Sequence, residues 1–295
     1  MPNDRLRYRR AYWQMHFIIF LWGFTAVLGK LISLDALSLT WWRVGLSVFF
    51  LWLWRLGKKL AVSYTWKEQK RFVLLGLLLA VHWLSFFYSI KLQNVSVTLV
   101  TMSVSAFLTS VLEPVFYKRP FRLYEMLFGI LIIFSLAYVF SVANVKFWAV
   151  FFALTASLAG VLFTLINGLS IRRIPAVELS FRQLSYAFVF LTLALVVSGK
   201  WQSLSLPGFS DGIWLLVLSL VCTAYAYTAS LAVLKNINPY TLILSVNLEP
   251  VYGILLAIVF LHENREMGWH FYLGASMIIL LVFIEGFIKI RSMRR

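Results

Sequence analysis

The fold of this chain is decided by long apolar stretches such as residues 239–261, PYTLILSVNLEPVYGILLAIVFL, in which Glu249 is the single acidic or basic side chain. A bilayer core about 30 Å thick needs roughly 20 apolar residues of helix, so this stretch is long enough to cross it. Of the 295 residues, 61% are hydrophobic and 13% are charged, and the mean hydropathy is +0.85. This composition excludes an ordinary water-soluble domain. The 26 Phe, 13 Tyr and 12 Trp residues also exclude intrinsic disorder.

Charged and turn residues divide the whole chain into ten such stretches joined by short loops. No soluble domain fits between them, so any site must lie inside the helical bundle. The sequence therefore predicts an all-α membrane protein with ten transmembrane helices, placed near residues 13–34, 37–55, 71–91, 94–117, 123–142, 147–170, 176–198, 211–234, 239–261 and 268–288.

The positions of the basic residues predict how the chain is oriented. If the N-terminus is cytoplasmic, 20 of the 27 Lys and Arg residues fall in inner segments and 4 in outer loops, namely Lys91, Lys146, Lys200 and Arg265. This bias follows the positive-inside rule and predicts an even number of spans with both termini in the cytoplasm. The net charge of +16 is then explained by orientation and anionic lipid, and no nucleic-acid partner is expected.

A weak internal repeat relates the two halves of the chain. A shift of 144 positions aligns Lys91 with Lys235 and Leu112 with Leu256. Ten spans divide into two sets of five, residues 1–143 and 144–295, and an odd number of spans per half places the halves in the membrane in opposite senses. Inverted repeats of this kind support alternating access to a central site, so the sequence favours a transporter.

Three stretches carry a family resemblance: LWGFTAVLGK at residues 21–30, TWWRVGLS at 40–47, and NPYTLILSVNLEPVYGILLAIVFLHE at 238–263, which includes the stretch quoted above. Together with ten short-looped spans, they resemble the EamA family of the drug/metabolite transporter superfamily. The first half departs from this pattern, because Tyr117-Lys118-Arg119 stands where Leu261-His262-Glu263 stands in the second. The resemblance implies transport of amino acids or other small metabolites across a cell membrane, mostly the bacterial inner membrane, without a cofactor.

The expected function is therefore a secondary active transporter that exports amino acids or related compounds, with protons as the coupling ion. Two alternatives stay open: a transporter of organic cations such as quaternary amines or drugs, and a non-carrier such as a lipid flippase or a channel. An enzyme is not expected. The aspartates Asp4, Asp35 and Asp211 are terminal or lie near span ends, and no helical pair of histidines or nucleotide-binding loop is present.

Glu249 is the sharpest candidate for the substrate and proton site. It lies about ten residues into the ninth span, or roughly 15 Å, near the middle of the bilayer. Pro250 follows it, lacks an N–H, and is expected to leave the carbonyl of Val246 without its helical partner. A carboxyl group beside a broken helix suits a substrate or proton site. The alternative is a structural glutamate at a kink.

Other polar and aromatic side chains within the spans are candidates for the wall of the site. His82 can exchange a proton near neutral pH, although a hydrogen-bonded packing histidine is equally consistent with its position. Any of the neutral side chains could instead tie helices together. The predicted substrate-binding residues are Glu249, His82, Trp83, Asn167, Tyr225, Asn247 and Tyr252, and the predicted proton-coupling residues are Glu249 and His82.

Arg43 and Arg182 lie six or seven residues from the ends of their spans, a distance that an arginine side chain can cover to reach the membrane surface. A structural or gating role is expected for both arginines and for Pro250, with carboxylate binding as the alternative for the arginines. Glu113 is expected to form an ion pair with Lys118 or Arg119 at the inner mouth.

Overall fold

The computed structural model describes residues 2–58, 64–168, 174–202, 204, 206–233, 245, 246 and 248–293. All regular structure in these residues is helical. The helices are α1 (Pro2–Leu31), α2 (Ala36–Gly57), α3 (Trp66–Leu92), α4 (Val95–Met102), α5 (Ser105–Tyr117), α6 (Leu123–Val142), α7 (Phe147–Gly168), α8 (Ala176–Val197), α9 (Phe209–Ser219), the π-helical segment η1 (Leu220–Tyr225), α10 (Ala226–Val233), α12 (Glu249–Leu261), the short 3₁₀ helix η2 (Glu263–Arg265) and α13 (Trp269–Met293).

Eight stretches of the described chain are long and apolar enough to cross a membrane, and two shorter apolar helices cover Glu249–Leu261 and Trp269–Ile284. Large apolar side chains such as Phe134 and Leu280 are exposed on the outside of the bundle, where lipid would cover them. The prediction of an all-α membrane protein is confirmed. The number of ten spans and the cytoplasmic placement of both termini stay predictions.

One helix of each half begins and ends at a corresponding position. In the first half α5 follows α4 and begins at Ser105, and in the second half α12 begins at Glu249. The helices α5 and α12 are both 13 residues long and begin 144 positions apart, at Ser105 and Glu249. Both end in a left-handed residue, Lys118 with φ 51° and His262 with φ 54°. The 144-position shift seen in the sequence therefore relates equivalent helix ends.

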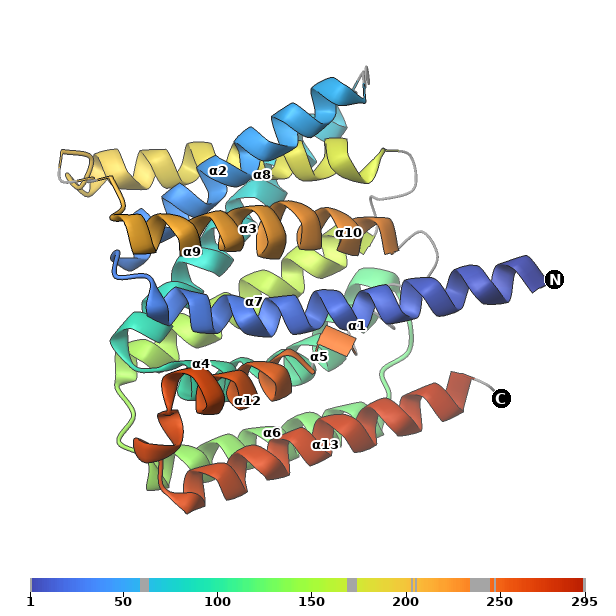
Figure 1. The fold of residues 1–295 in the computed structure, drawn as a ribbon. Coiled ribbons are helices and arrows are strands. Elements are labelled where there is room, and N and C mark those ends of the chain that lie inside the picture. The colour runs from blue at the N-terminus through green and yellow to red at the C-terminus, as the bar shows by residue number, and fades with distance from the viewer. Residues whose placement is uncertain are drawn as a thin grey trace.

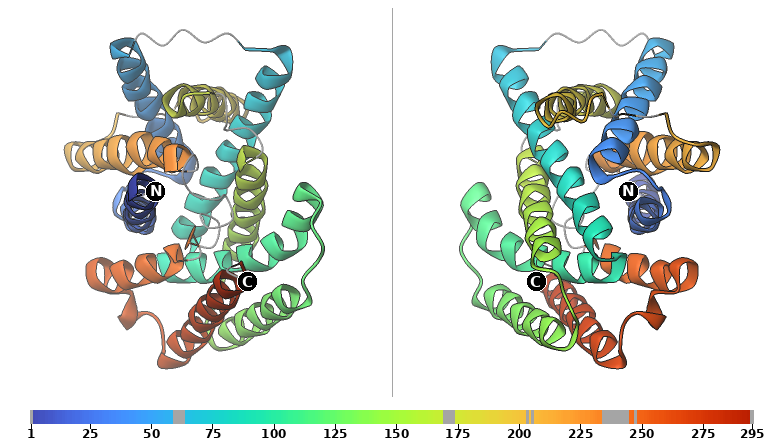
Figure 2. Two further views of the ribbon diagram at one scale, coloured as in Figure 1. Left: turned by 90° about the vertical axis from the view of Figure 1, so that its right-hand side faces the viewer. Right: turned by 90° about the vertical axis from the view of Figure 1, so that its left-hand side faces the viewer.

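The contacts between the halves also occur in matching pairs. Helix α3 packs on α7 and α8, while α9, η1 and α10 pack on α1 and α2. Likewise α4 contacts α7, and α12 contacts α1. In Figure 1, α1 runs from right to left and α7 runs from left to right. Figure 2 shows the bundle from its two ends. The helices α6 and α13 pack together at one side, away from α2 and α8.

The end of the bundle opposite the two termini is held together by polar contacts; we call it the tied end (Figure 1). The Lys30 side chain donates to the carbonyl of Gln93 at 3.1 Å, and that of Lys146 donates to the carbonyl of Leu92 at 2.8 Å. The backbone N–H of Ser33 donates to the Asp211 carboxylate at 3.0 Å. These contacts join the loops that follow α1 and α3 to the starts of α7 and α9.

Asp35 caps the N-terminus of α2 at this end, and its loss is expected to cost about 1 kcal/mol of stability. The side chain accepts from the N–H of Leu37 at 3.1 Å and from Ser38, and it pairs with Lys200 at 3.1 Å. Partial burial opposes ionisation, but these bonds prevail and lower the pKa of Asp35 below its ordinary 3.8. The charge-dependent stabilisation is therefore complete above pH 4 and is lost as the pH falls below that value.

Thermal unfolding of Asp35→Ala and Asp35→Asn in detergent checks this role. The Ala variant should unfold at a lower temperature than the Asn variant, because asparagine is an equally good cap. Equal midpoints for the two variants would show that the cap contributes nothing.

Candidate functional site

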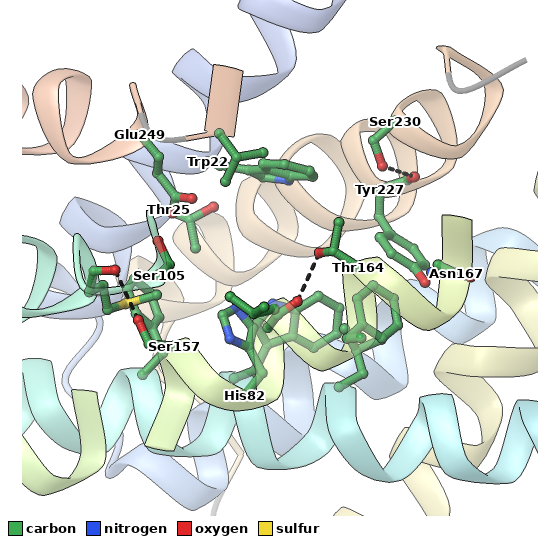
Figure 3. Close-up of a pocket in the computed structure, with 18 of the residues that line it drawn as sticks. Trp22, Thr25, His82, Ser105, Ser157, Thr164, Asn167, Tyr227, Ser230 and Glu249 are labelled. Carbon is green, nitrogen blue, oxygen red and sulfur yellow. Dashed lines mark hydrogen bonds between the residues drawn. The ribbon is translucent and has the colours of Figure 1, made fainter. Parts of the chain in front are cut away.

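A cavity lies at the centre of the bundle, between the two halves. The volume open to the centres of water molecules is about 170 Å³. One water needs about 10–15 Å³ of such volume, so the cavity has room for one small metabolite. Helices α1 to α5 line it from the first half and α7, α10 and α12 from the second (Figure 3). Its polar wall consists of Thr25, Arg43, His82, Ser105, Thr109, Ser157, Thr164, Asn167, Tyr227, Ser230 and Glu249.

Opposite charges face this cavity from different halves. Among the described lining residues, Arg43 is the only Lys or Arg and Glu249 is the only Asp or Glu. The two are close enough for their charges to attract each other, but they do not form a direct ion pair. The rest of the wall is largely apolar and aromatic, and includes Trp22, Trp83 and Phe163. The cavity thus offers two separated charges within an apolar enclosure.

Glu249 is placed by the start of a helix. It is the first residue of α12, and Pro250 lies in the first turn, where a missing N–H leaves no bond unmade. The positive end of the helix dipole favours a carboxylate at this position. The Glu249 side chain points toward Thr25 and the cavity (Figure 3) and makes no hydrogen bond to the described residues.

His82 reaches the cavity from the middle of α3. Its Nδ1 lies 2.7 Å from the carbonyl oxygen of Ala156 on α7, so Nδ1 carries the proton of this bond in the neutral ring. Gly160 permits this approach, because a Cβ there would lie 2.9 Å from Nδ1. The imidazole also stacks on Phe86, with 6.4 Å between ring centroids. His82 therefore ties α3 to α7 while bordering the cavity.

Arg43 does not extend to either membrane surface, contrary to the expectation from its position in the sequence. Its side chain is 1% exposed and borders the cavity from α2. Trp83, one of the predicted binding residues, lies against it, with the guanidinium carbon 4.3 Å from the ring centroid.

A short polar chain closes another part of the wall. Tyr227 donates to the amide oxygen of Gln183, and the Gln183 amide donates to Asn167 Oδ1 at 2.9 Å. Asn167 and Tyr227 border the cavity, whereas Gln183 lies behind them. The buried Asn167 Nδ2 has no partner in the described part of the chain, so it is available to donate to a bound molecule.

Three other predicted residues do not border the cavity. The Tyr225 side chain is 38% exposed, and Tyr252 packs edge-on against Phe20 with 5.9 Å between centroids. Arg182 pairs with the buried Glu178 at 3.1 Å. Asn247 lies outside the described residues.

The predicted ion pair of Glu113 is present, and its partner is Arg119. Arg119 Nη2 lies 2.8 Å from a carboxylate oxygen of Glu113 and 2.7 Å from one of Glu125. This pair links α5 to the start of α6 and does not border the cavity.

The wall also contains hydroxyl groups that were not predicted from the sequence. Thr25 and Thr164 donate to carbonyls one turn earlier in their own helices, at 3.2 and 2.8 Å, and Ser157 donates across to Met102 on α4 at 2.9 Å. Figure 3 shows Ser105 and Ser157 on the same side of the cavity. Serine and threonine are common on membrane helices, so no local signal separates these residues from others. In the described residues, no group of three His, Cys, Asp or Glu side chains could hold a metal ion.

Comparison with known proteins gives one family and one fold. A solved structure titled "Crystal structure of protein" superimposes with a TM-score of 0.65 at 15% sequence identity, covering 92% of this chain and 96% of that chain. At this identity, the likeness concerns the fold alone. No curated protein matches the chain. The family model described as the EamA-like transporter family matches twice, over residues 10–141 and 147–285.

Proposed function

The chain belongs to the EamA-like transporter family, and from this premise we propose that it is a secondary active transporter that exports amino acids or related compounds by alternating access. We place it in a cell membrane, the inner membrane in a bacterium, with ten spans in two inverted halves and both termini in the cytoplasm. The observation that carries the proposal is the central cavity, which is built from both halves and whose described lining includes one acidic and one basic side chain.

The arrangement of the helices supports alternating access. Matching contacts relate the two halves, and α1 and α7 run in opposite directions (Figure 1). Two halves with these properties can exchange conformations and open one central site to either side of the membrane. In such a cycle the contacts of the tied end would form and break, whereas the cavity walls would keep their composition.

Glu249 is the proposed coupling group. A carboxyl group inside a membrane protein is costly and commonly takes part in ion or proton movement. Glu249 has no hydrogen-bond partner among the described residues, so a proton or the ammonium group of a substrate can occupy it in turn. His82 is the second proposed proton site, through the ring nitrogen that does not bond to Ala156.

A transporter of organic cations is the second candidate. It is favoured by the aromatic part of the wall, since Trp22, Trp83 and Phe163 border the same cavity as Glu249. An aromatic face and a carboxylate together suit a quaternary amine. A lipid flippase fits less well, since about 170 Å³ leaves no room for a whole lipid.

Counterflow in proteoliposomes tests the proposed function. Vesicles are loaded with unlabelled amino acids, quaternary amines or nucleosides, one pool at a time, and entry of the labelled compound is followed with and without a pH gradient. We expect the amino acid pool to accelerate entry of its own label several-fold over protein-free vesicles. Acceleration by the amine pool alone would favour the second candidate, and acceleration by no pool would contradict both.

A further inference from the structure

Arg43 is a deeply buried charge that does not belong to an ion pair in the described chain. It is the eighth residue of the 22-residue helix α2, and its side chain is 1% exposed. An arginine at this depth of a bilayer is costly unless the protein or a ligand compensates its charge.

The guanidinium is held in place by neutral groups. Its Nε donates to Thr223 Oγ1 at 2.7 Å, and its carbon lies 4.3 Å from the centroid of Trp83 and 5.4 Å from that of Phe87. Thr223 in turn donates its own proton to the carbonyl of Leu218 at 2.7 Å, so a lone pair of Oγ1 faces Arg43. These contacts fix the orientation of the guanidinium but bring no negative charge to it.

Thr223 lies in the π-helical segment η1, which allows its hydroxyl group to donate to Leu218 while accepting from Arg43. A π turn widens the helix locally, and such turns are frequent at functional sites. The carbonyl that accepts the Thr223 proton lies five residues earlier in the chain. Beside this segment, Ser47 donates to the carbonyl of Ser219 at 2.9 Å and so links α2 to the end of α9. Hydrogen bonds from Arg43 and Ser47 thus connect α2 to η1 and the end of α9.

The Arg43 guanidinium has N–H donors that are not used by the hydrogen bond to Thr223. Its Nη1 is buried without a partner in the described residues. Glu249 borders the same cavity but is not in ion-pair contact with Arg43. A buried guanidinium with unused donors has a strong preference for a carboxylate, which it can bind through two parallel hydrogen bonds.

We propose that Arg43, positioned by Thr223 and Trp83, is a carboxylate-binding subsite of the cavity, so that the transported compound carries a carboxylate group. Glu249 borders the same cavity as a separate acidic group, which suits an amine on the same compound. This inference rests on the proposed function, since it assumes that the cavity is the transport site. Thr223 is a positioning residue that acts through Arg43.

Wild-type counterflow with three matched pools tests the subsite: neutral amino acids, the corresponding amino acid amides, and the corresponding decarboxylated amines. Each pool is paired with a labelled member. We expect the amino acids to exchange at least about tenfold faster than the amides or amines, since hydrogen bonds to charged groups are worth about 1.5–3 kcal/mol. Equal exchange of all three pools would overturn the subsite and leave the transporter intact. The absence of exchange by any pool would overturn both.

Variants then assign the preference to Arg43. Arg43→Gln should reduce the acid-to-amide exchange ratio to about one, and Arg43→Lys should retain part of it, because lysine keeps the charge but loses the planar fork. Thr223→Val should raise the KM for the acids with little effect on the amides, whereas the matched control Thr223→Ser should retain wild-type values. An unchanged acid-to-amide ratio in both folded Arg43 variants would overturn the assignment. Thermal unfolding in detergent identifies variants that fail to fold.

Discussion

Replacement of Glu249 by glutamine is expected to remove proton-linked transport while the protein stays folded. The amide has nearly the same shape as the carboxylate but cannot bind and release a proton or pair with an ammonium group. Loss of a hydrogen bond to a charged group costs about 1.5–3 kcal/mol, which corresponds to a tenfold to hundredfold fall in uptake at low substrate concentration. The acceleration of uptake by a pH gradient should disappear altogether.

Uptake into proteoliposomes with and without a pH gradient measures both effects. Glu68→Gln is the matched control, because it removes a partly exposed carboxylate in the first turn of α3 that does not border the cavity. Glutamine also suits the capping box that Glu68 forms with Thr65. If Glu249→Gln keeps gradient-dependent uptake at the level of this control, Glu249 is not the coupling group.

A second large effect is expected at Glu263, where loss of the side chain should destabilise the junction of the two halves. Glu263 follows the left-handed residue that ends α12, and its side chain is buried. Its two carboxylate oxygens accept the backbone N–H groups of Val95 and Ser96, each at 2.8 Å. Asn94 accepts the next N–H, that of Val97, at 2.9 Å. The backbone N–H groups at the start of α4, which have no partner within the helix, are therefore satisfied largely by a residue of the other half.

Glu263→Ala would leave two buried N–H groups without acceptors, at about 1–3 kcal/mol each. Glu263→Gln would keep one acceptor and place an amide N–H against a backbone donor, so its effect should be intermediate. The order of thermal stability in detergent is expected to be wild type, then Gln, then Ala. Glu266→Gln, in the same turn but exposed, is the matched control, because the glutamine oxygen can still accept from Asn94 Nδ2, which lies 3.4 Å from the Glu266 carboxylate. A Glu263→Ala protein as stable as this control would show that the carboxylate does not hold the halves together.

The same contact explains the difference between the halves that the sequence shows. Position 119 corresponds to position 263 under the 144-position shift, and it holds an arginine. Arg119 turns back to Glu113 and Glu125 within the first half, whereas Glu263 reaches across to the start of α4. A basic residue at position 119 and an acidic residue at the equivalent position 263 therefore make different contacts. Arg119 forms ion pairs within the first half, and Glu263 joins the two halves.

The candidate site could be predicted in part from single residues. Glu249, His82, Trp83 and Asn167 were expected from their depth, and all four border one cavity. Depth did not predict the facing of Tyr225, because η1 adds a residue to the turn and changes the helical register just before it. Whether a side chain faces the cavity also depends on the neighbouring helices, which pack against its helix only in the folded bundle.

The sequence by itself determined the membrane class, the family and the correspondence between α5 and α12 in the two halves. Apolar length, motifs and repeat spacing are properties of the linear sequence. Only the tertiary structure decided which polar groups meet. Arg43 and Thr223 lie 180 positions apart, and Val95 and Glu263 lie 168 apart. Hydropathy sets the depth of each residue in the bilayer. The direction and the partners of each side chain follow from how the helices pack. A rotation of a helix, or one extra residue in a π-helical turn, decides whether a side chain faces the lipid or the cavity.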